Sequence, residues 1–145
     1  KGGLLYHFPT KEALVAGLVA HFTDEFESML RSAAASEPQA TGSFTRSFIE
    51  ATFRTTPAPP RLDAALLAGV ALNPELLAGL QERFRTWQTT IENDGLDPTF
   101  ASLLRYAADG VWLSELLGLA PPTEELRERL HRLMLDLIDR ESARL

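Results

Sequence analysis

The chain has 145 residues, no cysteine, 45% hydrophobic residues and a formal net charge of -6. This length suffices for one domain with a sizeable core and is short for two, and the composition is that of a folded protein, not a disordered one. The acidic balance excludes a chain that coats nucleic acid as a whole, so nucleic-acid contacts would have to come from a local basic face. The lack of cysteine excludes disulfides and thiolate metal sites and is compatible with the reducing cytoplasm.

Two apolar runs are the longest in the chain, at residues 13–20 and 64–72. Both fall well short of the roughly 20 residues that a membrane-spanning helix needs. The first residues also lack the long apolar stretch and cleavage site of a signal peptide. We therefore expect a cytoplasmic protein with no membrane partner.

The first half of the chain predicts two helices. Apolar residues recur at helical spacing over Lys11–Ala35, and Thr10 stands where an N-cap belongs. Turn-forming residues follow at 36–43, and a second apolar face predicts a helix over about Phe44–Thr55. The sequence TPAPP at 56–60 then ends it, because a helix cannot run through these prolines.

The second half of the chain predicts four more helices. A short apolar one is expected over Arg61–Leu72, and Asn73-Pro74 has the order of an N-cap and a first-turn proline for the next, which ends near 93–95. Asp97-Pro98 starts another that stops at 118–122, and Thr123 caps the last. No segment alternates with a period of two, so the predicted fold is an all-α bundle of about six helices.

The opening stretch KGGLLYHFPTKEAL combines a short helical segment, a proline stop and a newly capped helix. Its Lys1, Tyr6, His7 and Lys11 are groups that reach phosphates or base edges. On residue types alone the commoner interpretation is different: the apolar residues are core and the polar groups are solvated surface.

The order of these residues resembles the end of the helix-turn-helix in the tetracycline-repressor (TetR) family of transcriptional regulators. There a lysine and small residues precede leucine, one or two tyrosines and His-Phe-Pro-Ser/Thr-Lys-Glu-Ala-Leu; the match departs at Leu5, where many members have a first tyrosine. The resemblance implies a recognition-helix remnant at residues 1–9 and a ligand-binding and dimerisation domain at 10–145. The DNA-binding residues that it implies are Lys1, Gly2, Gly3, Tyr6, His7 and Lys11.

The resemblance also implies that the two helices that brace the recognition helix, roughly the first 35 to 45 residues of such a regulator, are absent here. Operator DNA would then be a partner of the full-length protein only.

A weaker match, YAADGVWL at residues 106–113, is similar to an Asp-Gly-Leu-Trp segment in the penultimate helix of many TetR members. In that family the last two helices pair with their copies in a second subunit. A leucine stripe alone more often marks an intramolecular core, but the resemblance favours a homodimer. The expected interface consists of Gly110, Leu113, Leu117, Leu126, Leu130, Leu133 and Leu137.

Bulky aromatic residues are concentrated in the middle helices, where such stripes usually form core packing. In the TetR family the same helices enclose an apolar cavity for an inducer, as ligand sites between bundle helices generally do. We therefore predict a small, largely apolar ligand of unknown identity. The candidate pocket residues are Phe48, Phe53, Leu66, Val70, Phe84, Trp87 and Tyr106, with His21, Arg54, Gln88 and Asn93 as candidate orienting groups.

An enzyme is the main rival class. None of the three histidines has a His or Cys partner at the spacing of a metal site, and nothing in the spacing of Asp109, Ser114 and His131 supports a triad. We expect no catalytic residue, metal or cofactor. The predicted function is a DNA-binding regulator, usually a repressor in this family although activation stays open, and the alternative is a helical protein-interaction or structural bundle without DNA-linked switching.

Overall fold

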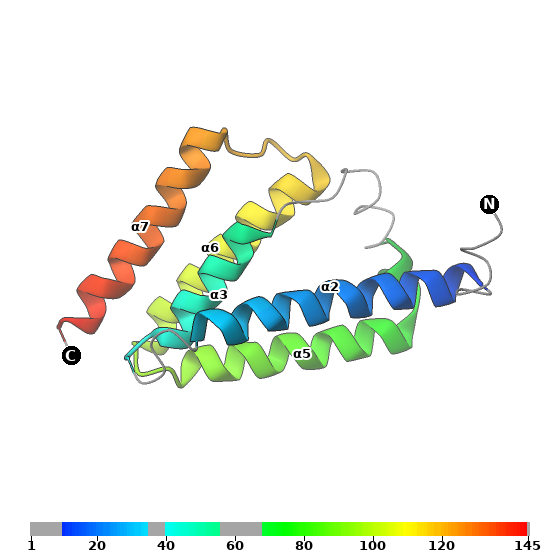
Figure 1. The fold of residues 1–145 in the computed structure, drawn as a ribbon, viewed down its shortest axis with the longest axis horizontal. Helices are drawn as coiled ribbons and strands as arrows, with labels where there is room; N and C mark the ends of the chain where they lie inside the picture. Colours follow the sequence, from blue (N-terminus) through cyan, green and yellow to red (C-terminus); the bar gives the residue numbers. More distant parts are fainter. Residues whose placement is uncertain (1–9, 35–39, 56–67, 145) are drawn as a thin grey trace.

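The computed structural model describes residues 10–34, 40–55 and 68–144. Within these ranges the chain has no strand, and residues 68–71 form a helical turn of the segment expected at Arg61–Leu72, whose earlier part lies outside the described residues. None of the complete helices combines the length and apolar character that a bilayer span requires. The all-α prediction is confirmed by the five complete helices: α2 (Lys11–Ala34), α3 (Ser43–Arg54), α5 (Pro74–Glu92), α6 (Pro98–Leu117) and α7 (Glu124–Ser142) (Figure 1).

Four of these helices begin at caps that the sequence predicts. Thr10, Asn73, Asp97 and Thr123 each accept a hydrogen bond from a backbone N–H two or three residues further on. Such a bond satisfies one of the donors that the first turn of a helix leaves unpaired. Local chemistry is therefore enough to start α2, α5, α6 and α7.

The start of α3 is different, because its N-cap is Gly42, which has no side chain to offer. Asp94, in the turn between α5 and α6, caps it instead: Oδ1 accepts from the Phe44 N–H at 3.2 Å and Oδ2 from the Thr45 N–H at 2.7 Å. The Asp94 carbonyl also accepts from the Gly42 N–H at 2.8 Å. This turn therefore fixes where α3 begins.

Helix α3 is the centre of the bundle and packs against α2, α5, α6 and α7 (Figure 1). Its Phe48 and Ile49 are essentially inaccessible to solvent. On the side of α2 and α5, Phe26, Phe48 and Phe84 surround Trp87, with ring centroids 5.0–6.0 Å from the indole. These four aromatic rings form the centre of the core and stabilise the fold mainly through the large apolar area that they bury.

The core ends halfway along α2 and α5, which begin at the same end of the molecule (Figure 1). Among the described residues, α2 contributes nothing to the core before Phe26, and α5 contributes nothing before Phe84. The apolar side chains of these first halves, such as Leu14, Leu18 and Leu80, are only half-buried. One end of the bundle is thus well packed and the other is not.

Candidate functional site

A cleft of about 650 Å³ opens at the loosely packed end, where α2 and α5 begin. Small-molecule sites usually have volumes of about 300–1,000 Å³. Val15 of α2 and Leu76 of α5 line it with apolar surface, and Lys11, Glu12 and Glu75 add exposed charges. A molecule in this cleft would therefore contact an apolar wall and both positively and negatively charged side chains.

The helical turn at 68–71 lies directly against α2 beside this cleft. A Cβ atom built on Gly69 would be only 3.0 and 3.2 Å from the two γ-carbons of Val15. A glycine here therefore leaves room for the Val15 side chain to lie directly on the backbone of this turn. Val70, one of the predicted pocket residues, is buried next to this contact.

The other predicted pocket residues are dispersed. Phe48, Phe84 and Trp87 lie together in the aromatic core, whereas Phe53 stacks on His131 near the end of α3, with 4.8 Å between centroids. Tyr106 is 58% exposed on the outside of α6. Leu66 lies outside the described residues.

Most of the predicted DNA contacts also lie outside the described residues, namely Lys1, Gly2, Gly3, Tyr6 and His7. Lys11 is described: it is the exposed first residue of α2 and borders the cleft. Its contact with DNA stays a prediction.

The predicted dimer interface divides into two groups. On α6, Gly110, Leu113 and Leu117 are exposed. On α7, Leu126 and Leu133 are exposed, while Leu130 and Leu137 are half-buried against the core. Leu130 and Leu137 therefore already contribute to the core of the chain, whereas the other five residues are exposed and free to meet a second molecule.

Two further residues extend the exposed group, Leu103 and Tyr106, which are 65% and 58% exposed. Their spacing to Gly110, of three to four residues a step, places them on the same stripe of α6. We call the combined surface the outer apolar face; it consists of Leu103, Tyr106, Gly110, Leu113, Leu117, Leu126 and Leu133.

A buried arginine, Arg105, cross-links α5 and α6. Its guanidinium donates to Gln88 at 3.1 Å and pairs with Asp109 at 2.9 Å, and it lies over the rings of Phe84 and Tyr106. Burial raises the pKa of the Asp109 carboxyl, and the positive charge of Arg105 opposes this shift. Arginine suits this position because it can pair, donate and stack at once. Sequence alone offers no signal for its burial, since Arg and Asp four residues apart usually lie on a solvated helix face.

His131 of α7 lies against the end of α3. Its Nε2 is buried and has no hydrogen-bond partner in the described part of the chain. Burial lowers the pKa of the His131 imidazole; Glu50 acts to raise it, and Arg127 and Arg54 lower it further. The neutral imidazole is therefore the form that fits this site.

The arrangement does not assemble the one catalytic triad that could be drawn from the sequence. The Ser114 hydroxyl donates to the Val111 carbonyl at 2.7 Å, and Asp109 is paired with Arg105. His131 bonds to neither residue. In the described ranges no three His, Asp or Glu residues are grouped so that they could hold a metal ion.

Residues 42–139 match the sequence model of a family described as tetracyclin repressor-like, C-terminal domain. The matched region runs from the cap of α3 into the last turns of α7 and includes most of the chain. The chain therefore belongs to this family, whose members are typically regulatory proteins. No curated protein and no solved structure matches it significantly.

Proposed function

We propose that the chain is the ligand-binding and dimerisation part of a cytoplasmic, DNA-binding transcriptional regulator. In this proposal the regulator is a repressor that leaves its operator when a small, largely apolar molecule binds. The observation that carries the proposal is the family match over residues 42–139. Residues 1–9 would be the end of the helix-turn-helix, and residues 10–145 the body that controls it.

The outer apolar face supports pairing of two copies. Leu103 of α6 and Leu133 of α7 are more than half exposed there, and a Cβ built on Gly110 would meet open space. Large apolar side chains exposed in a row along one helix, as Leu103, Tyr106, Leu113 and Leu117 are on α6, are typical of an interaction surface. A two-fold axis through α6 and α7 would cover it with the same surface of a second chain.

The cleft at the starts of α2 and α5 supports a ligand site. Helix α2 runs from this cleft to the aromatic core, and the segment of residues 1–9 precedes it directly in the chain. A ligand that prefers one spacing of α2 and α5 would shift the regulator between DNA-competent and DNA-incompetent states. Differential affinity for the two states is essential, because tight binding to both shifts nothing.

The test uses a protein in which a complete helix-turn-helix precedes α2. Fluorescence anisotropy on DNA from the promoter beside the gene should show salt-dependent binding to paired half-sites about one helical turn apart, and some members of an apolar ligand panel should reverse it. Equal affinity for the promoter and for scrambled DNA would contradict the regulator proposal. It would favour the alternative of a helical interaction bundle.

A pair of variants tests the ligand site. Leu76→Trp fills part of the cleft, whereas Ala78→Trp adds the same ring at an exposed position of α5. Leu76→Trp should keep operator binding and lose the ligand response, and Ala78→Trp should keep both. A full ligand response in Leu76→Trp would place the ligand elsewhere.

A further inference from the structure

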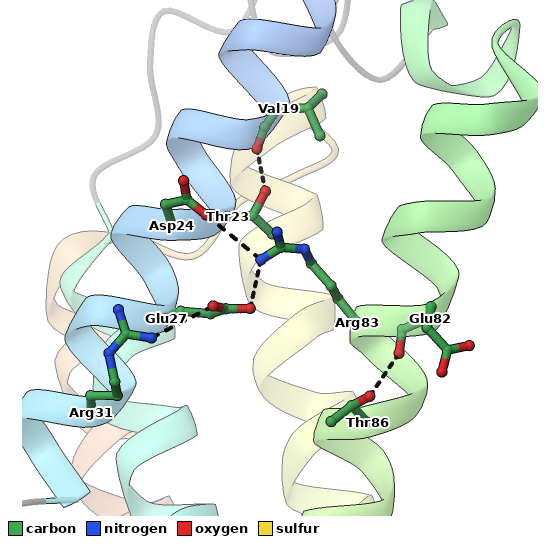
Figure 2. Close-up of polar contacts among 8 residues, drawn as sticks. All are labelled: Val19, Thr23, Asp24, Glu27, Arg31, Glu82, Arg83 and Thr86. Carbon is green, nitrogen blue, oxygen red and sulfur yellow. Dashed lines mark hydrogen bonds and ion pairs between the residues drawn. The ribbon is translucent and has the colours of Figure 1, made fainter.

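Arg83 of α5 makes the polar contacts that attach α2 to another helix. Its Nη1 lies 2.6 Å from Glu27 Oε1 and 3.7 Å from Asp24 Oδ1 (Figure 2). The remaining side-chain hydrogen bonds and ion pairs of α2 in the described residues stay inside that helix, for example Glu27 with Arg31 and the Thr23 hydroxyl donating to the Val19 carbonyl. One arginine therefore supplies every directional contact between α2 and the rest of the described body.

The other attachments of α2 are apolar. In its second half Phe26 contacts Phe48 and Trp87, and near its start Val15 lies against Gly69. Helix α2 packs mainly on α3 and approaches α5 much less closely. Apolar packing is not directional, so the half-buried contacts in the first half of α2 constrain its separation from α5 less than a polar contact would.

The position of Arg83 suits a residue that sets this separation. It lies one turn before Trp87, and its partners Asp24 and Glu27 flank Phe26 on α2. The contact therefore stands at the boundary between the packed core and the loosely packed end with the cleft. Glu27 and Arg83 are 30% and 39% exposed, so water screens their pair less than it screens a fully exposed one.

We propose that Arg83 is an ionic latch that holds α2 at a fixed distance from α5. With the latch closed, the start of α2 has one preferred position beside the cleft. With it open, α2 keeps its aromatic anchor, and its first half can move away from α5. The effect on DNA binding rests on the function proposed above, whereas the latch itself does not.

The latch can be measured without DNA or ligand. Because the chain has no cysteine, cysteines introduced at the exposed Ala20 of α2 and Ala78 of α5 give unique sites for spin labels. Arg83→Gln should widen the label-to-label distance distribution, and about 1 M NaCl should widen that of the unaltered protein. Arg85→Gln is the matched control, because the ion pair of Arg85 with Glu82 lies within α5.

Stability measurements provide a second readout. Arg83→Gln should lower Tm by roughly 2–4 °C. Glu27→Gln should lower Tm less in the Arg83→Gln protein than in the unaltered protein, since the two residues share one interaction. Distance distributions that are the same in Arg83→Gln, Arg85→Gln and the unaltered protein would overturn the latch. If Arg83→Gln fails to fold, the same comparison applies to Glu27→Gln.

Operator binding separates the latch from the proposed function. In the full-length protein Arg83→Gln should change operator affinity or its ligand dependence roughly fivefold or more, and Arg85→Gln should change neither. A widened distance distribution in a protein that binds no operator would leave the latch standing and remove the regulator. If Arg83→Gln leaves the label-to-label distances unchanged in a protein that binds its operator and responds to ligand, the regulator stands and the latch is removed.

Discussion

Replacing Asp94 with alanine removes the carboxylate that caps α3 from the α5–α6 turn. Thr45 is fully buried, so its N–H would lose the 2.7 Å bond without gaining water, at a cost of about 1–3 kcal/mol. The longer bond from Phe44 and the loss of negative charge at the helix N-terminus add about 0.5–1 kcal/mol. We expect the free energy of unfolding to fall by about 1.5–4 kcal/mol, and Tm by about 4–14 °C.

Urea and thermal unfolding followed by far-UV circular dichroism, at one fixed protein concentration, measure this change. Asp94→Asn keeps one acceptor and should lose about half as much stability. Asp136→Ala is the control, because that exposed aspartate makes no hydrogen bond or ion pair within the described residues; it should change stability by less than about 0.5 kcal/mol. Equal stabilities of Asp94→Ala and Asp136→Ala would refute the capping role.

Three further predictions concern the packing of the body. Because burial lowers the pKa of His131, the folded protein binds fewer protons there than the unfolded chain. The free energy of unfolding should therefore be highest above about pH 6.5 and decline as the pH falls below it. His131→Phe should flatten this part of the pH–stability curve. Gly42→Ala should lower the free energy of unfolding by about 2–4 kcal/mol, since φ is +78° and the new Cβ would lie 2.8 Å from the Leu96 side chain. Gly79→Ala has open space in α5 and should raise it by up to about 1 kcal/mol; a loss of stability in both variants would contradict this prediction. Arg127→Met leaves the mostly buried Glu115 without its 2.7 Å partner and should destabilise more than the double replacement with Glu115→Met in chemical denaturation; additive losses would show that the pair is not coupled.

The helices could be predicted from the sequence because their signals are local. The cap side chains Thr10, Asn73, Asp97 and Thr123 stand within three residues of the donors that they satisfy. The predicted helix over Lys11–Ala35 ends one residue later than α2, and the one over Phe44–Thr55 is shifted by one residue from α3. Gly95 follows the end of α5, and Gly118 is the C-cap of α6.

The site residues that sequence reasoning missed depend on distant partners. The Asp94 carboxylate caps a helix fifty residues away in the chain. Arg83 and Arg105 look like solvated helix residues until α2, α5 and α6 are placed beside one another. No short-range pattern distinguishes them from arginines such as Arg85, which pairs only within its own helix.

A second property that the sequence does not determine is the side to which an apolar stripe of a helix faces. Periodicity places Tyr106 on one stripe with Gly110 and Leu113, but it does not say whether that stripe faces the core or another molecule. Sequence reasoning placed Tyr106 in the ligand pocket, whereas the structure puts it on the outer apolar face. Only the packing of α6 against α3 and α5 decides this.

Pairing of two chains through the outer apolar face is the property on which the regulator proposal depends most, and light scattering coupled to gel filtration measures it directly. At micromolar concentration the unaltered chain should have twice its mass of 16.0 kDa. Leu133→Glu should give the single-chain mass, and Leu72→Glu, the same change on an exposed leucine beside the cleft, should keep the double mass. A folded, unaltered chain that elutes at the single-chain mass would contradict the dimer and, with it, the two-fold recognition of an operator.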